Sequence, residues 1–498
     1  MAQKKGKSPR KENTTAKLFA YPAKLRCEIA GKPNGKWHHV QFVTQEEAKK
    51  LTGLPAFFKA DAGETATQAT GFVVGLGSLE KLDGETFADT VAAALAKAAQ
   101  KLEEYQVVVD RAVYDKVGFR TALRLLAVAQ SNAEYPSDFL KGEKNRKKVI
   151  VKKTEIVVPQ SFAAVAGEIL ASALVEARHI NAMRQTQALP GNYLTPQTMD
   201  ERAAVIAKQY KLTRKSFGKA ELARMGAGGI IAVSQGSDRE PRLIVLEYRH
   251  PQAKKTLGLV GKGVTFDTGG ISLKPGADMH EMKYDMSGSA MALHALAAIA
   301  EQKIPVNVIC AIAMVENMPS GNAFKPGDVY TALNGKTVEV QNTDAEGRLI
   351  LADALTYVQK NYKTDLLIDM ATLTGACVVA LGDFYAGLFS NNGAARAIVE
   401  KAAAESREPV WALPIGPRYR ELLNSDIADI NNIGGRYGGA CTAAEFLNAF
   451  VDEGQMWVHL DIAGVGMIKK PFSVYTASGS GYGVRLLAEV ARQMAGGV

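Results

Sequence analysis

The sequence predicts an α/β protein with two domains joined by a long helix, and the second domain is expected to hold a mostly parallel central sheet. Three observations support this prediction. A chain of 498 residues is longer than one ordinary domain, and with 47% hydrophobic residues it can bury a large core. Apolar, β-rich runs alternate with helical stretches, as in layered α/β folds. In the second part these runs are continuously apolar, which is typical of strands covered on both faces.

The first part of the chain shows this alternation over residues 18–160. The runs GFVVGLG (71–77) and QVVVD (106–110) are strand candidates, and a helical pattern occupies 85–105 between them. These elements predict a separate N-terminal α/β domain.

A long connecting helix is expected next. The stretch 161–184 has apolar residues at helical spacing, begins with Ser161 and is followed by Pro190-Gly191. The expected organisation is a basic flexible tail, an N-terminal α/β domain, a linking helix and a second domain, at residues 1–17, 18–160, 161–188 and 189–498.

The second domain is expected to alternate strands and helices around one sheet. Its strand candidates are RLIVLEY (242–248), TLGLVG (256–261), VNVICAIAM (306–314), TDLLIDMA (364–371) and MWVHLDIA (456–463). Helical segments are expected near 285–302, 346–361, 394–406, 441–452 and 483–495. A sheet of this kind binds ligands at the carboxyl ends of its strands.

The net charge of +9 is unevenly placed. Residues 1–160 hold 27 Lys or Arg against 18 Asp or Glu, whereas residues 161–498 hold 33 of each. The excess is concentrated in the first 26 residues and in a basic run over 141–153. Such a stripe could attract phosphates, which leaves nucleic-acid binding open, although a solvated tail and loop explain the same charges.

The sequence predicts neither a membrane span nor a secretory signal. No charge-free stretch is longer than 286–300, which contains three polar residues and falls short of the ~20 apolar residues of a span. The basic N-terminus has no apolar core behind it. The four cysteines lack CxxC spacing and are expected to be reduced packing residues. We therefore expect a cytoplasmic protein that does not contact membranes.

A glycine-rich segment, GKGVTFDTGGISLKP (261–275), follows directly after a predicted strand and contains Lys262, Asp267 and Lys274. It does not fit a phosphate-binding loop. Its glycines allow the backbone to approach another group closely. Taken alone, Asp267 is explained as a turn former, and Lys274 as a solvated side chain before a proline.

Two further segments place acidic side chains where helices are expected to begin. Asp285 precedes a predicted apolar helix, whose N-terminus favours a carboxylate. Thr343 and Glu346 have the spacing of a capping box. Capping explains each of these residues singly, but it does not explain why Asp344, Glu346 and Arg348 crowd at one strand-to-helix boundary.

Four carboxylates, those of Asp267, Asp285, Asp344 and Glu346, thus lie at similar boundaries of the predicted sheet. If they met, repulsion would drive some of them neutral unless cations were held among them. Two divalent cations about 3.5–4 Å apart can share bridging carboxylates and lower the pKa of a water from ~15.7 toward ~7. Oxygen-rich ligation with one amine suits zinc, manganese or cobalt.

Other catalytic arrangements lack their motifs. The seven histidines form no HExxH, and no GxSxG serine elbow is present. The chemistry that the sequence favours is attack by water, assisted by metal ions bound to carboxylates.

These residues and motifs resemble those of the leucyl aminopeptidase family, the two-metal cytosolic peptidases. The family signature NTDAEGRL stands at 342–349. Four accompanying motifs occur in the family's order and approximate spacing: GKGVTFDTGGISLKP (261–275), MKYDMSG (282–288), DMATLTGA (369–376) and HLDIAG (459–464). The resemblance covers the whole second domain, which it identifies as a catalytic peptidase domain. In the first domain it rests mainly on FVVGLG and the α/β layout.

The resemblance implies two divalent metal ions per subunit, zinc or manganese, with cobalt or magnesium as alternatives. Their implied ligands are the bridging Asp267 and Glu346, Lys262 and Asp285 at one site, and Asp344 at the other.

Two further residues have implied catalytic roles. Lys274 would stabilise the developing gem-diolate oxygen, a role worth ~3 kcal/mol. Arg348 would hold a bicarbonate ion that acts as the general base, for which a planar guanidinium is well shaped.

The implied reaction is release of the N-terminal residue from short peptides, by attack of a dimetal-bound water on the first peptide bond. One metal would bind the free α-amine of the substrate. An apolar pocket would favour Leu or Met over smaller residues by about 1–3 kcal/mol. The implied substrate-binding residues are Lys274, Met282, Asn342, Thr372, Leu373, Gly375 and Ala463. Gly466 stands on the expected pocket floor, where a glycine leaves more width than a methionine.

The resemblance also implies a homohexamer, and bacterial relatives in the family bind DNA. DNA binding through the basic N-terminal part is therefore one alternative role. A two-metal phosphoesterase is another, because it would share the carboxylate cluster, but it has no need of an amine-binding pocket.

Overall fold

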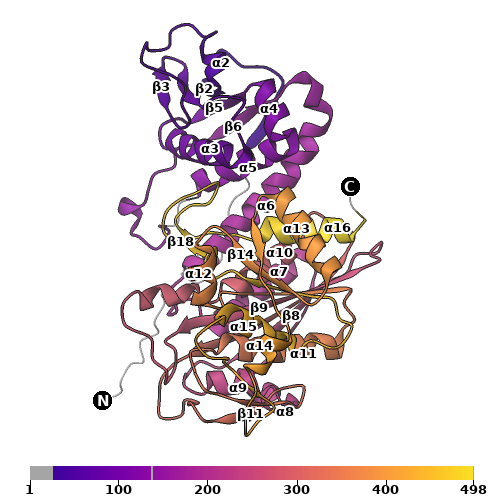
Figure 1. Ribbon diagram of the computed structural model, residues 1–498. Helices are drawn as coiled ribbons and strands as arrows, with labels where there is room; N and C mark the ends of the chain where they lie inside the picture. Colours follow the sequence, from indigo (N-terminus) through magenta and orange to yellow (C-terminus); the bar gives the residue numbers. More distant parts are fainter. Residues whose placement is uncertain (1–25, 136–137, 497–498) are drawn as a thin grey trace, which may run out of the picture.

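The computed structural model describes residues 26–135 and 138–496, and two sheets organise them (Figure 1). The expected tail at 1–17 lies outside the described residues. The first sheet has six strands in the order β1 (Cys27–Ala30), β6 (Lys153–Val157), β5 (Glu104–Val109), β2 (His38–Val43), β4 (Gly71–Gly75) and β3 (Thr65–Gln68). All neighbouring strands are parallel except the edge pair β3 and β4. Its helices are α2 (Gln45–Ala48), α3 (Gly84–Ala98), α4 (Arg111–Val117) and α5 (Phe119–Glu134).

The helix expected over 85–105 is shorter than its pattern indicates. Helix α3 begins after Asp83, whose side chain accepts a hydrogen bond from the backbone N–H of Thr86 at 2.8 Å, and it ends at Ala98. Strand β5 begins six residues later, and its Tyr105 and Val107 are fully buried in the sheet. Burial of these side chains between β2 and β6 outweighs the helical propensity of the preceding residues.

The connection between the sheets is helix α6 (Ala163–Ala188), which follows the short 3₁₀ turn η2 (Gln160–Phe162). Among the described residues, Gln160–Ala188 is the one helical segment long and apolar enough to span a membrane by length and composition. The same helix carries Glu176, His179 and Arg184, all buried and all bonded to other parts of the protein. Length and composition are therefore weak evidence for a span here.

The second sheet has eight strands. Their order is β15 (Val410–Ala412), β14 (Ala386–Ser390), β17 (Trp457–Asp461), β13 (Leu366–Ala371), β9 (Thr256–Asp267), β10 (Asn307–Asn317), β8 (Arg242–Tyr248) and β7 (Thr213–Phe217). The four central strands, β17, β13, β9 and β10, are parallel to one another. The predicted mostly parallel sheet is therefore confirmed at its centre, and each strand expected in this domain overlaps an observed one.

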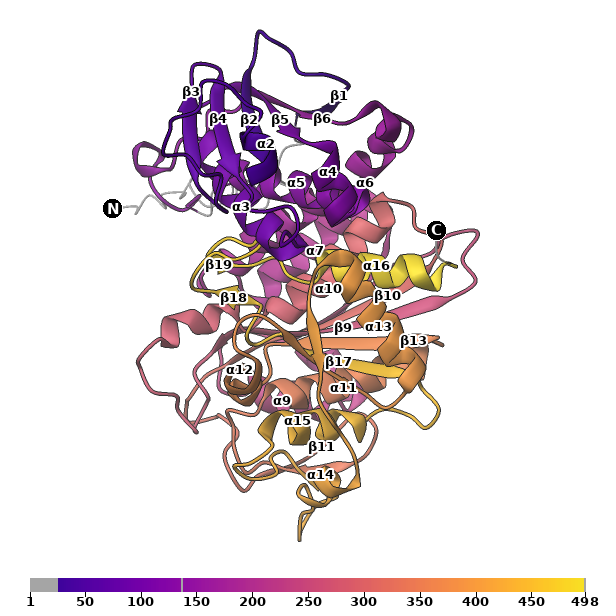
Figure 2. The same ribbon diagram turned by 45° about the horizontal axis from the view of Figure 1, so that its top comes forward.

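Helices cover both faces of this sheet (Figures 1 and 2). The helices on the side of α6 are α7 (Pro196–Tyr210), α10 (Ser287–Glu301), α13 (Gly393–Ser406) and α16 (Val484–Met494). Those on the other side are α9 (Gly228–Ser234), α11 (Gly347–Asn361) and α15 (Gly439–Asn448). The remaining elements are α8 (Lys219–Met225), η1 (Glu143–Asn145), η3 (Met279–Tyr284), α12 (Gly375–Leu381), α14 (Pro417–Glu421), β11 (Val329–Thr331), β12 (Thr337–Glu339), β16 (Ile430–Asn431), β18 (Met467–Ile468) and β19 (Ser478–Gly479).

A buried ion network joins the two halves of the molecule through α6. Glu176 of α6 is fully buried and pairs with Arg124 of α5 at 3.0 Å and with Arg492 of α16 at 2.5 Å. Glu489 of α16 pairs with the same two arginines, at 3.2 and 2.8 Å. Burial alone would raise the pKa of Glu176, but the two guanidinium groups hold it at about 2. The carboxylate is therefore charged at neutral pH and ties α5 to α16.

Replacing Glu176 with Gln is expected to destabilise the protein by about 3–5 kcal/mol at neutral pH, because two buried arginines lose their partner. The pKa of this carboxyl is lower in the folded protein than in the unfolded chain, so its contribution is present above the unfolded value of 4.5 and is lost as the pH falls toward 2. Urea unfolding of both proteins between about pH 7 and pH 3 checks this. The difference should stay constant at first and shrink below 4.5; a constant difference throughout would contradict the account.

Candidate metal centre

The sequence-predicted site residues meet at the carboxyl edge of the second sheet. Strand β9 ends at Asp267, and α10 begins two residues after Asp285. Helix α11 begins directly after Glu346, which is its N-cap residue. Because the central strands are parallel, their carboxyl ends and the following loops share one edge. Three segments that are distant in sequence therefore bring their acidic side chains together.

Two lysines lie among the four carboxylates. Lys262 Nζ is 2.8 Å from Asp285 Oδ1 and 2.8 Å from Glu346 Oε1. Lys274 Nζ is 2.8 Å from Asp267 Oδ2 and also pairs with Asp344. One carboxylate oxygen from each of Asp267, Asp344 and Glu346 lies within 4.8 Å of the others, close enough to hold a metal ion.

Two glycines make this close approach possible. A Cβ on Gly347, the first residue of α11, would lie 2.6 Å from Lys262 Cε, so only glycine leaves room for the lysine. Gly269 has a φ of +87°, and a Cβ there would lie 3.0 Å from Asp344 Oδ1. These contacts give a structural reason for the glycines in NTDAEGRL and in the loop after β9.

Both capping explanations of the acidic residues are wrong, whereas the turn expected at Asp267 is present. Helix α11 has no side-chain cap, because Thr343 Oγ1 donates to the Gly269 carbonyl at 2.6 Å and accepts from the Ser272 N–H. Helix α10 likewise has no side-chain cap from Asp285. Asp267 does form the expected turn, since its Oδ1 accepts from the Gly269 N–H at 2.9 Å, but its other oxygen faces Lys274.

The cluster carries an excess of negative charge. Four carboxylates face two ammonium groups. Burial, followed by repulsion from Asp267, raises the pKa of Asp344 to about 7. Burial also raises the pKa of Asp285 well above its usual range, with a further contribution from Glu346. Burial would lower the pKa values of Lys262 and Lys274, but the surrounding carboxylates raise both above the ordinary value.

This arrangement fits divalent cations. Asp285 Oδ2 is buried and has no hydrogen-bond partner among the described residues, and the buried Glu346 Oε1 is paired there with the Lys262 ammonium alone, at 2.8 Å. An unpaired buried carboxylate oxygen in a negatively charged cluster is costly unless a cation satisfies it. Four carboxylates with one amine form an oxygen-rich ligand set of the kind that zinc, manganese or cobalt accepts.

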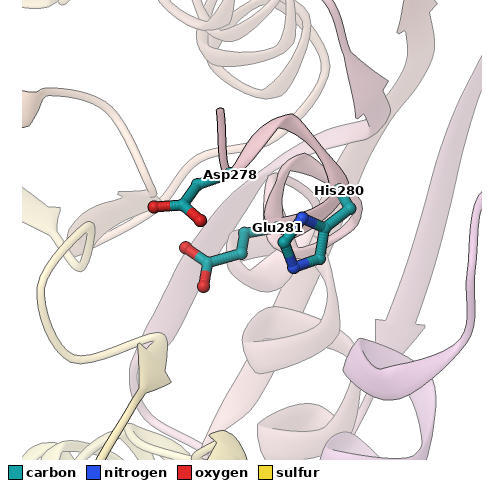
Figure 3. Close-up of side chains that lie close together, drawn as sticks. All are labelled: Asp278, His280 and Glu281. Atoms are coloured by element: carbon teal, nitrogen blue, oxygen red, sulfur yellow. The ribbon is translucent and has the colours of Figure 1, made fainter. Parts of the chain in front are cut away.

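A second group of possible ligands lies nearby but is less suited. Asp278, His280 and Glu281 bring their side chains together at the start of the 3₁₀ helix η3, before α10, as Figure 3 shows. Asp278 and His280 are exposed, and Lys469 lies 3.6 Å from Asp278 and 3.3 Å from Glu281. An exposed group that a lysine already neutralises has less need of a metal than the buried cluster.

Arg348 lies in the first turn of α11, close to the cluster and buried. Its Nη1 donates to the Asn432 carbonyl at 2.7 Å, whereas its Nε has no hydrogen-bond partner among the described residues. Burial lowers the pKa of this guanidinium to about 10, so it is still charged at neutral pH. An unpaired N–H of a buried guanidinium suits an anion.

Three of the six expected pocket residues contact the cluster. Thr372 donates from Oγ1 to Asp285 Oδ1 at 2.7 Å and accepts from Lys262 Nζ at its carbonyl, at 2.9 Å. The Met282 carbonyl accepts from the Asp285 N–H, and Asn342 Oδ1 accepts from the Asp344 N–H. Of the remaining three, Leu373 lies on the loop after β13, Gly375 begins α12 directly after that loop, and Ala463 lies on the loop after β17.

Sequence reasoning missed two buried polar residues that support these groups. Asn317, the last residue of β10, donates from Nδ2 to Asp267 Oδ1 at 2.8 Å and to the Thr343 carbonyl at 3.1 Å. Asp461, the last residue of β17, accepts from the Leu373 and Ala463 N–H groups. Their position at the carboxyl end of an apolar strand was the available signal.

A cavity of about 1110 Å³ lies beside the cluster but does not contain it. Phe266 and Glu316 line the cavity, whereas the neighbouring Asp267 and Asn317 belong to the cluster. Successive strand residues point to opposite faces, so the cavity lies on the other side of β9 and β10 from the carboxylates.

Known proteins match both the sequence and the fold. The model of the cytosol aminopeptidase family, catalytic domain, matches residues 181–488. A probable cytosol aminopeptidase of Chlorobium limicola is 41% identical over 463 residues, which cover 88% of this chain and 90% of the relative. One of Rickettsia felis is 48% identical over 307 residues, 61% of each chain.

A solved structure, described as bottromycin maturation enzyme BotP in complex with Mn, aligns with a TM-score of 0.82. It is 31% identical, and the alignment covers 92% of this chain and 99% of that one. The resemblance expected from the motifs is thus confirmed over almost the whole chain. The protein belongs to the cytosol aminopeptidase family, which makes it a metal-dependent exopeptidase that acts at peptide N-termini.

Proposed function

We propose that this protein is a leucyl aminopeptidase that releases Leu, Met and other apolar N-terminal residues from short peptides. The observation that carries the proposal is the convergence of Asp267, Asp285, Asp344 and Glu346 around Lys262 and Lys274. A cluster with this excess of negative charge suits two divalent cations.

In this proposal two divalent ions would be held by Lys262 and Asp285 at one site and by Asp344 at the other, with Asp267 and Glu346 common to both. Zinc or manganese is the proposed metal, with cobalt or magnesium as alternatives. The ions would supply Lewis acidity and a water whose pKa is lowered toward ~7. Lys262 must be neutral to act as a ligand, and adjacent dications disfavour its ammonium form.

Two further side chains of this protein would take part in the reaction. Lys274 keeps its proton and donates hydrogen bonds to the oxygen of the attacked carbonyl, where negative charge develops. Arg348 would hold a bicarbonate ion with its unpaired Nε, and this anion would take the proton of the attacking water. No histidine is among the residues that bond to the cluster carboxylates in the described part of the chain, so a separate base is required.

The proposed side-chain pocket is lined by Met282, Asn342, Thr372, Gly375 and Ala463, with Leu373 offering backbone hydrogen bonds. A Cβ on Gly375 would have no atom within 4 Å, which supports open space at this position. A Cβ on Gly466 would lie 3.2 Å from Thr372 Cγ2, so this glycine borders the same pocket. Its missing side chain supports acceptance of several apolar residues rather than leucine alone.

The direct test is turnover of leucine amide by the purified protein. Chelation should abolish turnover, and addition of Mn²⁺ or Zn²⁺ should restore it. A phosphodiester assayed in parallel separates this proposal from a two-metal phosphoesterase. Hydrolysis of the phosphodiester but not of leucine amide would overturn the proposal.

Acetylation of the substrate amine is expected to prevent hydrolysis. In the proposed complex the free α-amine of the substrate binds at the metal cluster, and N-acetyl-leucine amide has no basic amine to offer. Sites built to bind a polar group reject an analogue that lacks it by about 10⁴-fold. Comparing kcat/KM for the two amides measures this factor, and similar values would show that the amine is not recognised.

We further propose that the enzyme is a cytoplasmic homohexamer. Light scattering of the purified protein would test the hexameric state.

DNA binding is the weaker alternative for the basic N-terminal part. Lys141, Lys144 and Arg146 are exposed, whereas Lys152 and Lys153 are already paired with glutamates. Charge-driven binding should weaken steeply between about 50 and 200 mM salt, and a tight complex that survives this range would favour a DNA-binding role.

A further inference from the structure

We propose that Asp461 is a positioning residue for substrate recognition: its buried carboxylate joins two loops that would carry part of the pocket for the substrate's N-terminal side chain. This inference rests on the proposed function. It assigns a role to a residue outside the metal cluster, on strand β17, which pairs with β13.

Asp461 gathers donors from both loops. Its Oδ1 accepts from the Leu373 N–H at 3.1 Å and from the Ala463 N–H at 3.1 Å. Its Oδ2 accepts from Thr374 Oγ1 at 2.7 Å. Leu373 and Thr374 follow β13, whereas Ala463 follows β17, so one carboxylate connects the ends of two adjacent strands.

The backbone of Asp461 is itself fixed by the sheet. It pairs with Ala371 of β13 on one side and with Gly387 of β14 on the other. The residue is fully buried, and no lysine or arginine pairs with its carboxylate among the described residues. Its three donors therefore supply the stabilisation that a buried carboxylate requires. A rigid anchor of this kind can hold a loop in one geometry.

The loop after β13 is held from the opposite side by the metal cluster. Lys262 Nζ donates to the Thr372 carbonyl at 2.9 Å, and Thr372 Oγ1 donates to Asp285 at 2.7 Å. The segment 372–374 thus lies between the cluster and Asp461. The backbone of Leu373 would bind the substrate, and the hydrogen bond from its N–H to Asp461 fixes its position.

Thr374 offers an independent way to test the same anchor. Its Oγ1 donates to Asp461 and also accepts from the Cys377 N–H at 3.0 Å, which caps α12. Serine keeps the hydroxyl, and valine removes it at similar volume. The pair Thr374→Ser and Thr374→Val therefore separates loss of the hydrogen bonds from loss of packing.

The experiment measures kcat and KM for leucine amide and for alanine amide, and the metal content of each protein. The proteins compared are the wild type, Asp461→Asn, Thr374→Val and Thr374→Ser. Asp369→Asn is the matched control, because Asp369 is an equally buried carboxylate on β13 that instead contacts His459 and Trp457. An asparagine at 461 keeps the volume but presents an amide that cannot accept at both positions.

Asp461→Asn is expected to raise KM for leucine amide about tenfold, as loss of a buried charge-assisted hydrogen bond does. In the same variant the preference for leucine amide over alanine amide should fall, and the metal content should stay at that of the wild type. Thr374→Val should show the same changes, whereas Thr374→Ser should behave like the wild type. Should Asp461→Asn fail to fold, the two Thr374 variants decide.

Three results would overturn the inference. The first is an unchanged KM and leucine preference in folded Asp461→Asn or Thr374→Val, and the second is a raised KM and reduced leucine preference in Asp369→Asn as well. The third is a reduced metal content in Asp461→Asn or Thr374→Val that accounts for their loss of activity. Each would leave the proposed function standing. Absence of leucine-amide turnover in the metal-loaded wild type would instead refute the proposed function.

Discussion

Asp267→Asn is expected to lower leucine-amide turnover by at least about 10³-fold, because it removes a carboxylate that would hold both ions. The ions would lower the pKa of the attacking water from ~15.7 toward ~7, and this effect would be weakened with them. The amide of asparagine is neutral, so the cluster also loses one of its four negative charges. We expect the variant to bind fewer divalent ions than the wild type after dialysis. Steady-state kinetics and metal analysis of the same preparation measure both effects.

Asp278→Asn is the matched control for this substitution. Asp278 belongs to the exposed group with His280 and Glu281, and it lies on the loop that leads to Asp285. It should keep both activity and metal content. If Asp278→Asn loses metal and Asp267→Asn does not, the ions bind at the exposed group and the assignment of the buried cluster is wrong.

Lys274→Ala is expected to lower kcat about 10²–10³-fold, since removal of one donor to a developing oxyanion costs about 3–4 kcal/mol. Burial lowers the pKa of Lys274, but Asp267, Glu346 and Asp344 raise it above its usual value, so the group is a charged donor at neutral pH. KM for leucine amide should change much less than kcat, because the oxygen gains its charge only in the transition state.

Lys469→Ala controls for the loss of a lysine near the site. Lys469 pairs with Asp278 and Glu281 and is largely exposed, so its removal should leave kcat unchanged. A loss in Lys274→Ala that appears only in KM would show that this lysine binds the substrate without stabilising the transition state.

Much of the fold of the second domain could be predicted from sequence because its strands are buried on both faces. The run 242–248 coincides with β8, and the runs at 256–261, 306–314, 364–371 and 456–463 all fall on central strands. Strand β9 continues beyond its predicted end to Asp267, because it keeps pairing with β10 through Val264 and, after an irregularity, again at Asp267. The short strands β14 and β15 at one end of the sheet were not predicted, since runs of three to five residues carry little periodicity.

The candidate site was predictable for a different reason. Asp267, Asp285, Asp344 and Glu346 stand at strand or helix ends, and parallel topology brings such ends to one edge. Local spacing was misleading where tertiary partners exist. Thr343 and Glu346 have the spacing of a capping box, but the hydroxyl of Thr343 binds the Gly269 carbonyl across the site. Asn317 and Asp461 act through contacts with loops far away in sequence, which one sequence does not reveal.

Diffraction from crystals grown with Mn²⁺, measured for anomalous scattering, tests the central claim most directly. The account predicts two peaks about 3.5–4 Å apart among Asp267, Asp285, Asp344 and Glu346, with Lys262 Nζ beside one of them. Peaks only at Asp278, His280 and Glu281, or a buried cluster whose carboxylates remain paired with Lys262 and Lys274 at saturating Mn²⁺, would contradict it.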